Sequence, residues 1–196
     1  MSKGFTNTER NAISIALIEV FEEELRFQKI NKISIDDLVK KVGISKGSFY
    51  NFYPSKEILF FHVINNIQKK LFDEMMIIAN KKKLTNKDKL KLILTMIAEK
   101  LQHHSWIQEL NGGDFEKTLR RLPQELKESL TSQDIIDFQT ILNHLNLETK
   151  VPIAKCVTMI QIILSSTTRA NDFGKHYNKS IKNLIDLLVD NLIVDK

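Results

Sequence analysis

The sequence predicts an all-α protein, and three observations lead to this fold class. Apolar residues recur at the three- and four-residue spacing of amphipathic helices through most of the 196 residues. Only 6 glycines and 3 prolines are present, so natural turns are few. No segment sustains the alternation of apolar and polar residues that is typical of a strand. With 42% hydrophobic and 27% charged residues, the composition is that of a globular protein.

Helix length divides the chain near residue 55. Residues 1–55 predict three short helices joined by tight turns, whereas residues 56–196 predict longer helices with wide apolar faces. We therefore expect an N-terminal domain at residues 1–55 and a helical domain at residues 56–196.

The first helix is expected over Asn11–Leu25. Its apolar face is formed by Ile13, Leu17, Val20 and Phe21. Thr6 or Thr8 can cap its start. Acids are unfavourable near the C-terminal end of a helix, so Glu22–Glu24 are interpreted as a solvated face. Beyond them the chain either continues the helix or forms an extra loop around Lys29–Lys32.

Two short helices follow, each with its own start and stop signals. Ser34 is expected to cap the first, which has acidic residues in its first turn and ends at Gly43. Ser45 is expected to cap the second, which ends at Pro54. A longer helix, capped by Ser55, is expected to run to about residue 80.

Helical patterns continue to the end of the chain and are broken at Gly112-Gly113 and Gly174. The expected helices are Lys87–Gln102, Phe115–Leu122, Gln124–Leu130, Ser132–Leu145, one from Pro152 to about Ala170, and a last amphipathic helix. The apolar stripe of that last helix comprises Tyr177, Ile181, Leu184, Ile185, Leu188 and Leu192.

The most informative segment, Ser34–Leu59, reads SIDDLVKKVGISKGSFYNFYPSKEIL. Two short helices joined by a tight turn at Gly43-Ile44, with Ile44 as an apolar plug between them, predict a helix-turn-helix. In this motif the second helix lies in the DNA major groove, and its first residues reach the bases.

The polar positions at the start of the second helix suit such a groove. Lys46 supplies positive charge, and Gly47 allows two backbones to approach closely. Ser48 and Asn51 can bond to base edges, and asparagine suits adenine.

Further positions suit the phosphates on either side of the groove. The hydroxyls of Tyr50 and Tyr53 can donate hydrogen bonds to phosphates. Lys56 lies at the start of the next helix, where backbone amides also favour an anion.

This segment closely resembles the signature of the TetR/AcrR family of bacterial regulators. The family pattern Gly-Val-Ser-Lys-Gly-Thr-aromatic-Tyr, followed by a Lys-Glu pair that opens the fourth helix, is here Gly43-Ile44-Ser45-Lys46-Gly47-Ser48-Phe49-Tyr50 and Ser55-Lys56-Glu57. The match covers roughly the first third of the chain, and the rest is similar in length, helical content and order of elements. The sequence departs from the pattern in a longer link before Ser34 and in valines where the family often has alanine.

The resemblance implies an all-α homodimer with a three-helix DNA-binding head and a helical body for effector binding and dimerisation. The last two helices would form the dimer interface. A small molecule in the body would change the spacing of the heads and release a repressor from a palindromic operator in double-stranded DNA. The DNA contacts implied residue by residue are Ser34, Ser45, Lys46, Gly47, Ser48, Tyr50, Tyr53 and Lys56, to which base-edge chemistry adds Asn51.

The effector site is expected beside the break at Gly112-Gly113, where a helix stops inside the body. The aromatic and methionine side chains that could line it, most of them plain core, are Phe61, Phe72, Met75, Met76, Met96, Trp106, Phe115, Phe138 and Met159. Our predicted effector contacts are Trp106, Phe115 and Met159.

Net charge supports DNA binding only weakly. The chain carries +5, but residues 1–56 hold nine Lys and Arg against seven Asp and Glu. The alternative hypothesis is therefore a helical ligand-binding or protein-interaction module whose head does not serve DNA.

No catalytic or metal-binding motif is recognisable, so neither an enzyme nor a cofactor is expected. His103 and His104 are adjacent and point about 100° apart on a helix, which is unsuitable for sharing one metal ion. There is no nucleophile elbow, glycine-rich phosphate loop or paired-carboxylate motif.

A cytoplasmic location without membrane association is expected. Cys156 is the only cysteine, which fits a reducing compartment. Met1–Arg10 is polar and lacks the apolar core of a signal peptide. The apolar run Val151–Leu164 is interrupted by polar residues and is too short for a membrane span.

Overall fold

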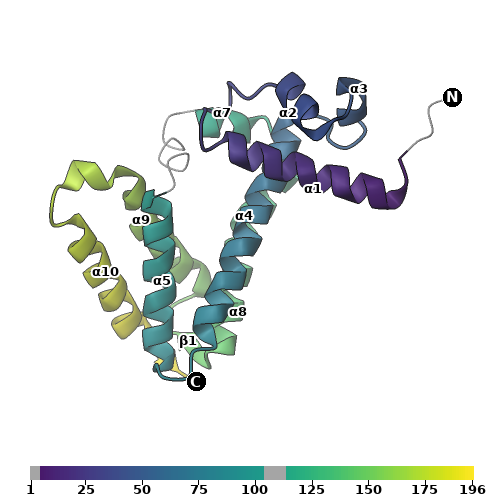
Figure 1. The fold of residues 1–196 in the computed structure, drawn as a ribbon. Helices are drawn as coiled ribbons and strands as arrows, with labels where there is room; N and C mark the ends of the chain where they lie inside the picture. Colours follow the sequence, from purple (N-terminus) through teal and green to yellow (C-terminus); the bar gives the residue numbers. More distant parts are fainter. Residues whose placement is uncertain (1–4, 104–113) are drawn as a thin grey trace.

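The N-terminal helices form a head, and one long helix connects it to a helical body (Figure 1). The structure is a computed structural model that describes residues 5–103 and 114–196. The head contains α1 (Asn7–Glu24), α2 (Ile35–Val42) and α3 (Lys46–Phe49). The connecting helix is α4 (Lys56–Ala79). The rest of the body comprises α5 (Asn86–His103), α7 (Asp114–Arg120), α8 (Gln124–His144), β1 (Leu147–Thr149), α9 (Ile153–Ser165), the 3₁₀ helix η2 (Ser166–Phe173), α10 (Tyr177–Leu192) and β2 (Ile193–Asp195). The predicted all-α class is confirmed.

Side-chain caps define the helix starts in the head. Thr6 caps α1 in a capping box: its hydroxyl accepts from the Glu9 amide at 3.3 Å, and the Glu9 carboxylate accepts from the Thr6 amide at 2.7 Å. Ser34, Ser45 and Ser55 each accept a hydrogen bond from the amide three residues further on. The cap predictions for these serines are confirmed, and of the two threonines Thr6 is the cap.

Two separate groups of buried side chains hold the fold together, and α4 contributes to both. The head core contains Leu17, Phe21, Leu25, Ile30, Ile33, Leu38, Val39, Phe49, Tyr53, Leu59, Phe60 and Val63. The last three belong to α4, so the N-terminal part of that helix is built into the head. Its C-terminal end, at Ile78 and Ala79, lies in the body core with α5, α8, α9 and α10. The single helix α4 therefore contributes buried side chains to both cores.

The segment between α1 and α2 is a loop, the second of the two expected alternatives. α1 ends at Glu24, and turns carry the chain to Ser34. Leu25, Ile30 and Ile33 are buried in the head core, whereas Phe27 is 79% exposed. The longer link is therefore held in place by its own apolar side chains.

The interpretation of Glu22–Glu24 as a solvated face is wrong for two of these residues. Glu22 pairs with Lys70 of α4 at 2.9 Å, and Glu24 pairs with Lys41 of α2. α1 lies across α4 and against α2, so the end of α1 meets basic side chains of its neighbours rather than water alone. These ion pairs offset the unfavourable position of acids at the C-terminal end of the helix.

Three features of the body differ from the expectations. Gln124–Leu130 and Ser132–Leu145 form the single helix α8, because no glycine or proline separates them. The apolar helix after Pro152 ends at Ser165, and η2 continues to Phe173. The sequence also gave no sign of the antiparallel pair β1–β2, in which Leu147 lies opposite Asp195 and Thr149 opposite Ile193. Strands of three residues are too short to show an alternating pattern.

Candidate nucleic-acid interface and effector cavity

The turn between α2 and α3 has the geometry of a helix-turn-helix. Gly43 takes the left-handed conformation, with φ of 77°, and its amide donates to the Val39 carbonyl at 2.9 Å. The Ile44 amide donates to the same carbonyl at 3.0 Å, and the half-buried Ile44 side chain packs against the head core. This places α3 at the surface of the head, next to α2.

The exposed start of α3 carries a cation that is only loosely held. Lys46 Nζ lies 2.8 Å from Asp36 Oδ2, and the two side chains are 52% and 67% exposed. The hydrogen bond from this lysine to Asp36 raises the pKa of Lys46, so the side chain is cationic at neutral pH. Exposed ion pairs are weak, so Lys46 can exchange Asp36 for a phosphate.

Gly47 is not required by the packing of the protein itself. A Cβ atom added there would meet only Ser45 Oγ, at 3.9 Å, which is an ordinary contact. Its φ is not in the left-handed region either, because only Gly43 and Gly174 have positive φ among the described glycines. A glycine that the fold does not need, exposed at the start of a surface helix, leaves space for something outside the protein.

Ser34, Ser45, Ser48, Tyr50 and Asn51 also lie at or near this surface. Ser34 and Ser45 use their hydroxyls as helix caps, and the Ser45 and Ser48 hydroxyls are 2.9 Å apart. Tyr50 is 50% exposed and rests edge-on against buried Phe49, at 5.4 Å between ring centroids. Asn51 is exposed, and its backbone carbonyl accepts a hydrogen bond from the Arg10 side chain. Ser45, Ser48, Tyr50 and Asn51 thus lie on or beside α3 with Lys46 and Gly47, whereas Ser34 lies at the start of α2.

Tyr53 does not belong to this surface, which corrects its predicted contact with phosphate. It is 3% exposed, and its hydroxyl lies 2.6 Å from Ser14 Oγ on α1. Burial raises the pKa of Tyr53, and the Ser14 hydrogen bond partly offsets that effect. Its ring is needed in the head core beside Phe49, and the chain turn after α3 points it inward.

The side chain of Lys56 likewise forms hydrogen bonds within the protein, which corrects the expectation that it contacts DNA. Its ammonium donates to the carbonyl oxygens of Ile30 and Ile33, both at 2.9 Å. Partial burial lowers the pKa of Lys56. This side chain therefore holds the loop between α1 and α2 against the start of α4.

Arg10 is a candidate that sequence reasoning missed. Its guanidinium donates to the Asn51 carbonyl at 3.2 Å and lies 5.1 Å from the centroid of the Phe52 ring. The side chain is exposed, and it adds a cation to the end of α3. No local pattern reveals it, because 41 residues separate Arg10 from Asn51.

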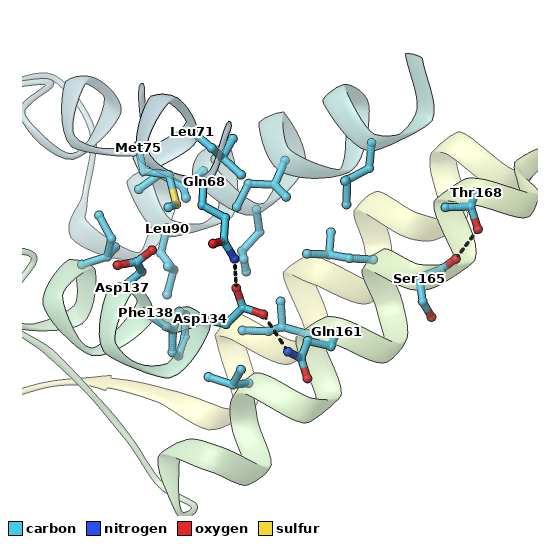
Figure 2. Close-up of a pocket in the computed structure, with 18 residues that line it drawn as sticks. Gln68, Leu71, Met75, Leu90, Asp134, Asp137, Phe138, Gln161, Ser165 and Thr168 are labelled. Carbon is cyan, nitrogen blue, oxygen red and sulfur yellow. Dashed lines mark hydrogen bonds between the residues drawn. The ribbon is translucent and has the colours of Figure 1, made fainter. Parts of the chain in front are cut away.

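The body contains a cavity of about 430 Å³ between α4, α5, α8 and α9. Figure 2 shows the side chains that surround it. Its wall consists of Gln68, Leu71, Met75, Leu90, Ile93, Leu94, Ile97, Leu101, Asp134, Asp137, Phe138, Ile141, Val157, Ile160, Gln161, Leu164, Ser165 and Thr168. A mostly apolar cavity of this size with a few polar groups is typical of small-molecule sites.

None of the three predicted effector contacts is among the described residues of the cavity wall. Trp106 and Gly112-Gly113 lie outside the described residues, as does the side chain of Phe115. Met159 is 37% exposed and is absent from the cavity wall, which corrects its assignment. On α9 the neighbouring residues Val157, Ile160 and Gln161 face the cavity, and a helical turn points Met159 elsewhere. From the broader set of aromatic and methionine candidates, the wall includes Met75 and Phe138.

Each of the last two α-helices, α9 and α10, exposes large apolar side chains. Ile162 of α9 is 65% exposed, and Leu184 and Leu187 of α10 are 49% and 60% exposed. The buried face of α10 is formed instead by Tyr177, Ile181, Ile185, Leu188 and Val189. Leu184 therefore does not belong to the buried stripe, and α10 has a second apolar face.

The fold and the α2–α3 surface together define a helix-turn-helix regulator with a helical body. Residues 28–63 match the family model described as bacterial regulatory proteins, tetR family. The chain is also 36% identical over 55 residues to the HTH-type transcriptional regulator EthR of Mycolicibacterium smegmatis. That alignment spans 28% of this chain and only 25% of the relative.

Solved structures share the fold over nearly the whole chain. FadR of Bacillus subtilis, in complex with stearoyl-CoA, is similar with a TM-score of 0.64 at 17% identity, over 89% of this chain and 97% of that one. A TetR transcriptional regulator of Legionella pneumophila is similar with a TM-score of 0.58 at 20% identity, over 95% and 98%. The N-terminal part of the chain, residues 28–63, therefore matches the TetR family, and the chain as a whole shares the fold of such regulators. Within the described residues, no helix is long and apolar enough to span a membrane.

Proposed function

We propose that the protein is a ligand-released transcriptional repressor that binds a palindromic DNA operator as a homodimer. The observation that carries the proposal is the surface formed by Ser45, Lys46, Gly47, Ser48 and Tyr50 on and beside α3. It combines an exchangeable cation, hydroxyl groups and a glycine that the fold itself does not require. These are the groups that a helix needs at its start to enter the major groove.

Dimerisation is supported by the exposed face of the last two helices. A protein surface rarely leaves several large apolar residues on adjacent helices in water unless a partner covers them. Ile162, Leu184 and Leu187 would pack against their counterparts in a second copy, which would bring four helices together at a two-fold axis. Two heads related by that axis would read the two halves of a palindrome.

Release by a ligand is supported by the position of α4. Gln68, Leu71 and Met75 of α4 line the body cavity, while Leu59 and Phe60 near its start lie in the head core. A ligand that displaces the cavity wall would therefore move the head of the same protomer. In a dimer this changes the separation of the two recognition helices, and DNA binding requires one particular separation.

A second link connects the body to the start of α4. Arg121, between α7 and α8, lies 3.2 Å from Glu57, the residue that follows Lys56. The same end of α4 holds the loop between α1 and α2 through Lys56. The start of α4 thus contacts the body through Glu57 and the head through Lys56.

The test is equilibrium binding of the full chain to the DNA that flanks its own gene, compared with unrelated DNA of equal length. We expect specific binding with a stoichiometry of one dimer or a multiple per site, and an affinity that falls steeply with salt. A reporter driven by that DNA should be less active when the protein is present. Absence of any preference for the flanking DNA would favour the alternative, an interaction module whose head does not serve DNA.

A further inference from the structure

The polar groups of the body cavity are concentrated around one carboxylate. Asp134 of α8 lies between two amides from other helices, as Figure 2 shows. Gln161 of α9 donates to Asp134 Oδ2 at 2.9 Å, and Gln68 of α4 donates to Asp134 Oδ1 at 3.4 Å. A second carboxylate, Asp137, lies one helical turn further along α8 and also lines the cavity.

Among the described residues, no cationic side chain lines the cavity beside these carboxylates. None of the described residues of its wall is lysine, arginine or histidine. Burial raises the pKa of Asp134; the hydrogen bonds from Gln161 and Gln68 partly offset this effect, and the nearby charge of Asp137 adds to it. Burial also raises the pKa of Asp137. The cavity is therefore a place where negative charge is disfavoured and a positive charge would be stabilised.

The same cluster contains a hydrogen-bond acceptor without a donor. Gln68 Oε1 is shielded from solvent and has no hydrogen-bond partner in the described structure. Buried acceptors without a donor are rare and call for an explanation. A ligand N–H group in the cavity would supply the missing donor beside the carboxylate of Asp134.

We propose that the effector is an amphipathic organic cation, whose protonated amine binds at Asp134 and Gln68 and whose apolar part fills the cavity. This inference rests on the proposed ligand-released function of the body. The apolar part would contact the leucine and isoleucine side chains of α5 together with Met75 and Phe138. An anionic ligand would meet two carboxylates and no cationic side chain among the described residues of the wall.

Binding of such a cation is coupled to the protonation of Asp134. The groups that face Asp134 are Gln68 of α4, the apolar residues of α5, Asp137 of α8 and Gln161 of α9. A cation favours the ionised carboxylate, so its affinity should increase as the pH rises through the pKa of Asp134 in the free protein.

The test uses four probes that share a ten-carbon chain and differ in their head groups: decylamine, decyltrimethylammonium, decanol and decanoate. Each is titrated into the full-length protein below its micelle concentration, and affinity and stoichiometry are measured by calorimetry. We expect decylamine to bind one per protomer and about ten- to hundredfold more tightly than decanol, the range expected for a charge-assisted hydrogen bond. Decyltrimethylammonium, which has no N–H donor, should bind more weakly than decylamine. Equal affinity of decanol and decylamine, or tighter binding of decanoate, would overturn the proposal.

Variants identify the site. Asp134→Asn should reduce the affinity for decylamine about tenfold or more, abolish its pH dependence and leave the affinity for decanol unchanged. Asp73→Asn is the matched control, because Asp73 is an exposed carboxylate of α4 outside the cavity wall. Circular dichroism verifies that both variants are folded. Unchanged decylamine binding in folded Asp134→Asn would contradict the assigned site.

DNA binding is measured separately, so the two proposals can fail independently. Operator binding without preferential amine binding would overturn the cationic effector and leave the repressor intact. Amine binding at Asp134 without any effect on DNA affinity would support the ligand class and contradict ligand release.

Discussion

Lys56 and Ile33 are joined by a hydrogen bond of 2.9 Å from the lysine ammonium to the backbone carbonyl oxygen. A second bond of the same length connects Lys56 to the carbonyl of Ile30. In the sequence pattern Lys56 has the position of a DNA contact, but in the structure it joins the loop before α2 to the start of α4. Its proposed role in DNA binding is therefore indirect, through the shape of the head.

Replacement of Lys56 should destabilise the protein. Lys56→Met retains much of the aliphatic stem but leaves the two carbonyls without their donor, at an expected cost of about 1–3 kcal/mol. Urea denaturation measures the loss, with Lys69→Met as the control, since Lys69 is an exposed lysine of the same helix. A variant with unchanged stability but reduced DNA affinity would show instead that Lys56 contacts DNA directly.

Gly47→Ala should separate folding from DNA binding. The fold has room for the methyl group, and alanine is favoured over glycine in a helix by about 1 kcal/mol, so stability should be unchanged or slightly higher. DNA affinity should fall about tenfold or more, because the methyl group would intrude on a close backbone approach. Thermal denaturation and a DNA titration of the same sample provide both values. Full DNA affinity in the alanine variant would refute a close approach at this position.

Asp134→Asn should change how stability depends on pH. The folded-state pKa of Asp134 is raised, so the folded protein binds this proton more readily than the unfolded chain. The stabilising contribution of the carboxyl group is therefore present below its unfolded pKa and is lost as the pH rises through the folded pKa. Relative to wild type, Asp134→Asn should gain stability as the pH rises through that window, as measured by thermal denaturation at several pH values. A difference that is constant with pH would indicate that burial does not perturb this group.

Leu184→Glu with Leu187→Glu should produce a monomer. Both side chains are exposed on the second apolar face of α10, and burial of a leucine contributes about 1.5–3 kcal/mol. Analytical ultracentrifugation of the wild type and the double variant measures the change in mass. Glu148→Gln, on the exposed face of β1, provides a control variant away from this surface. A wild-type monomer, or a double variant that remains dimeric, would contradict the assignment of the last helices as the dimer interface.

The head was largely predictable from the sequence because its signals are local. Ser34, Gly43 and Ser45 each determine a cap or turn through residues at most four positions away. The buried roles of Tyr53 and Lys56 could not be predicted in this way, because their hydrogen-bond partners Ser14 and Ile30 are distant in the sequence.

The body cavity could not be predicted for the same physical reason. Its polar cluster joins Gln68, Asp134 and Gln161, which come from three helices and are up to 93 residues apart in numbering. Each helix shows an apolar periodicity, but periodicity does not determine which polar side chains meet across the bundle. The prediction from aromatic and methionine residues selected Met159, whereas half of the described wall residues are leucine or isoleucine.

The most direct test of the central claim is a DNA titration of the double variant Lys46→Ala with Tyr50→Ala over a range of salt concentrations. The side chains of both residues are exposed on and beside α3, and neither belongs to the buried head core, so the variant should fold and dimerise normally. Lys83→Ala, an exposed lysine beyond the far end of α4, is the control and should bind like wild type. We predict that the double variant loses specific binding to the flanking DNA and that any residual binding has a shallower salt dependence. Wild-type affinity and salt dependence in the folded double variant would contradict the assignment of α3 as the recognition helix.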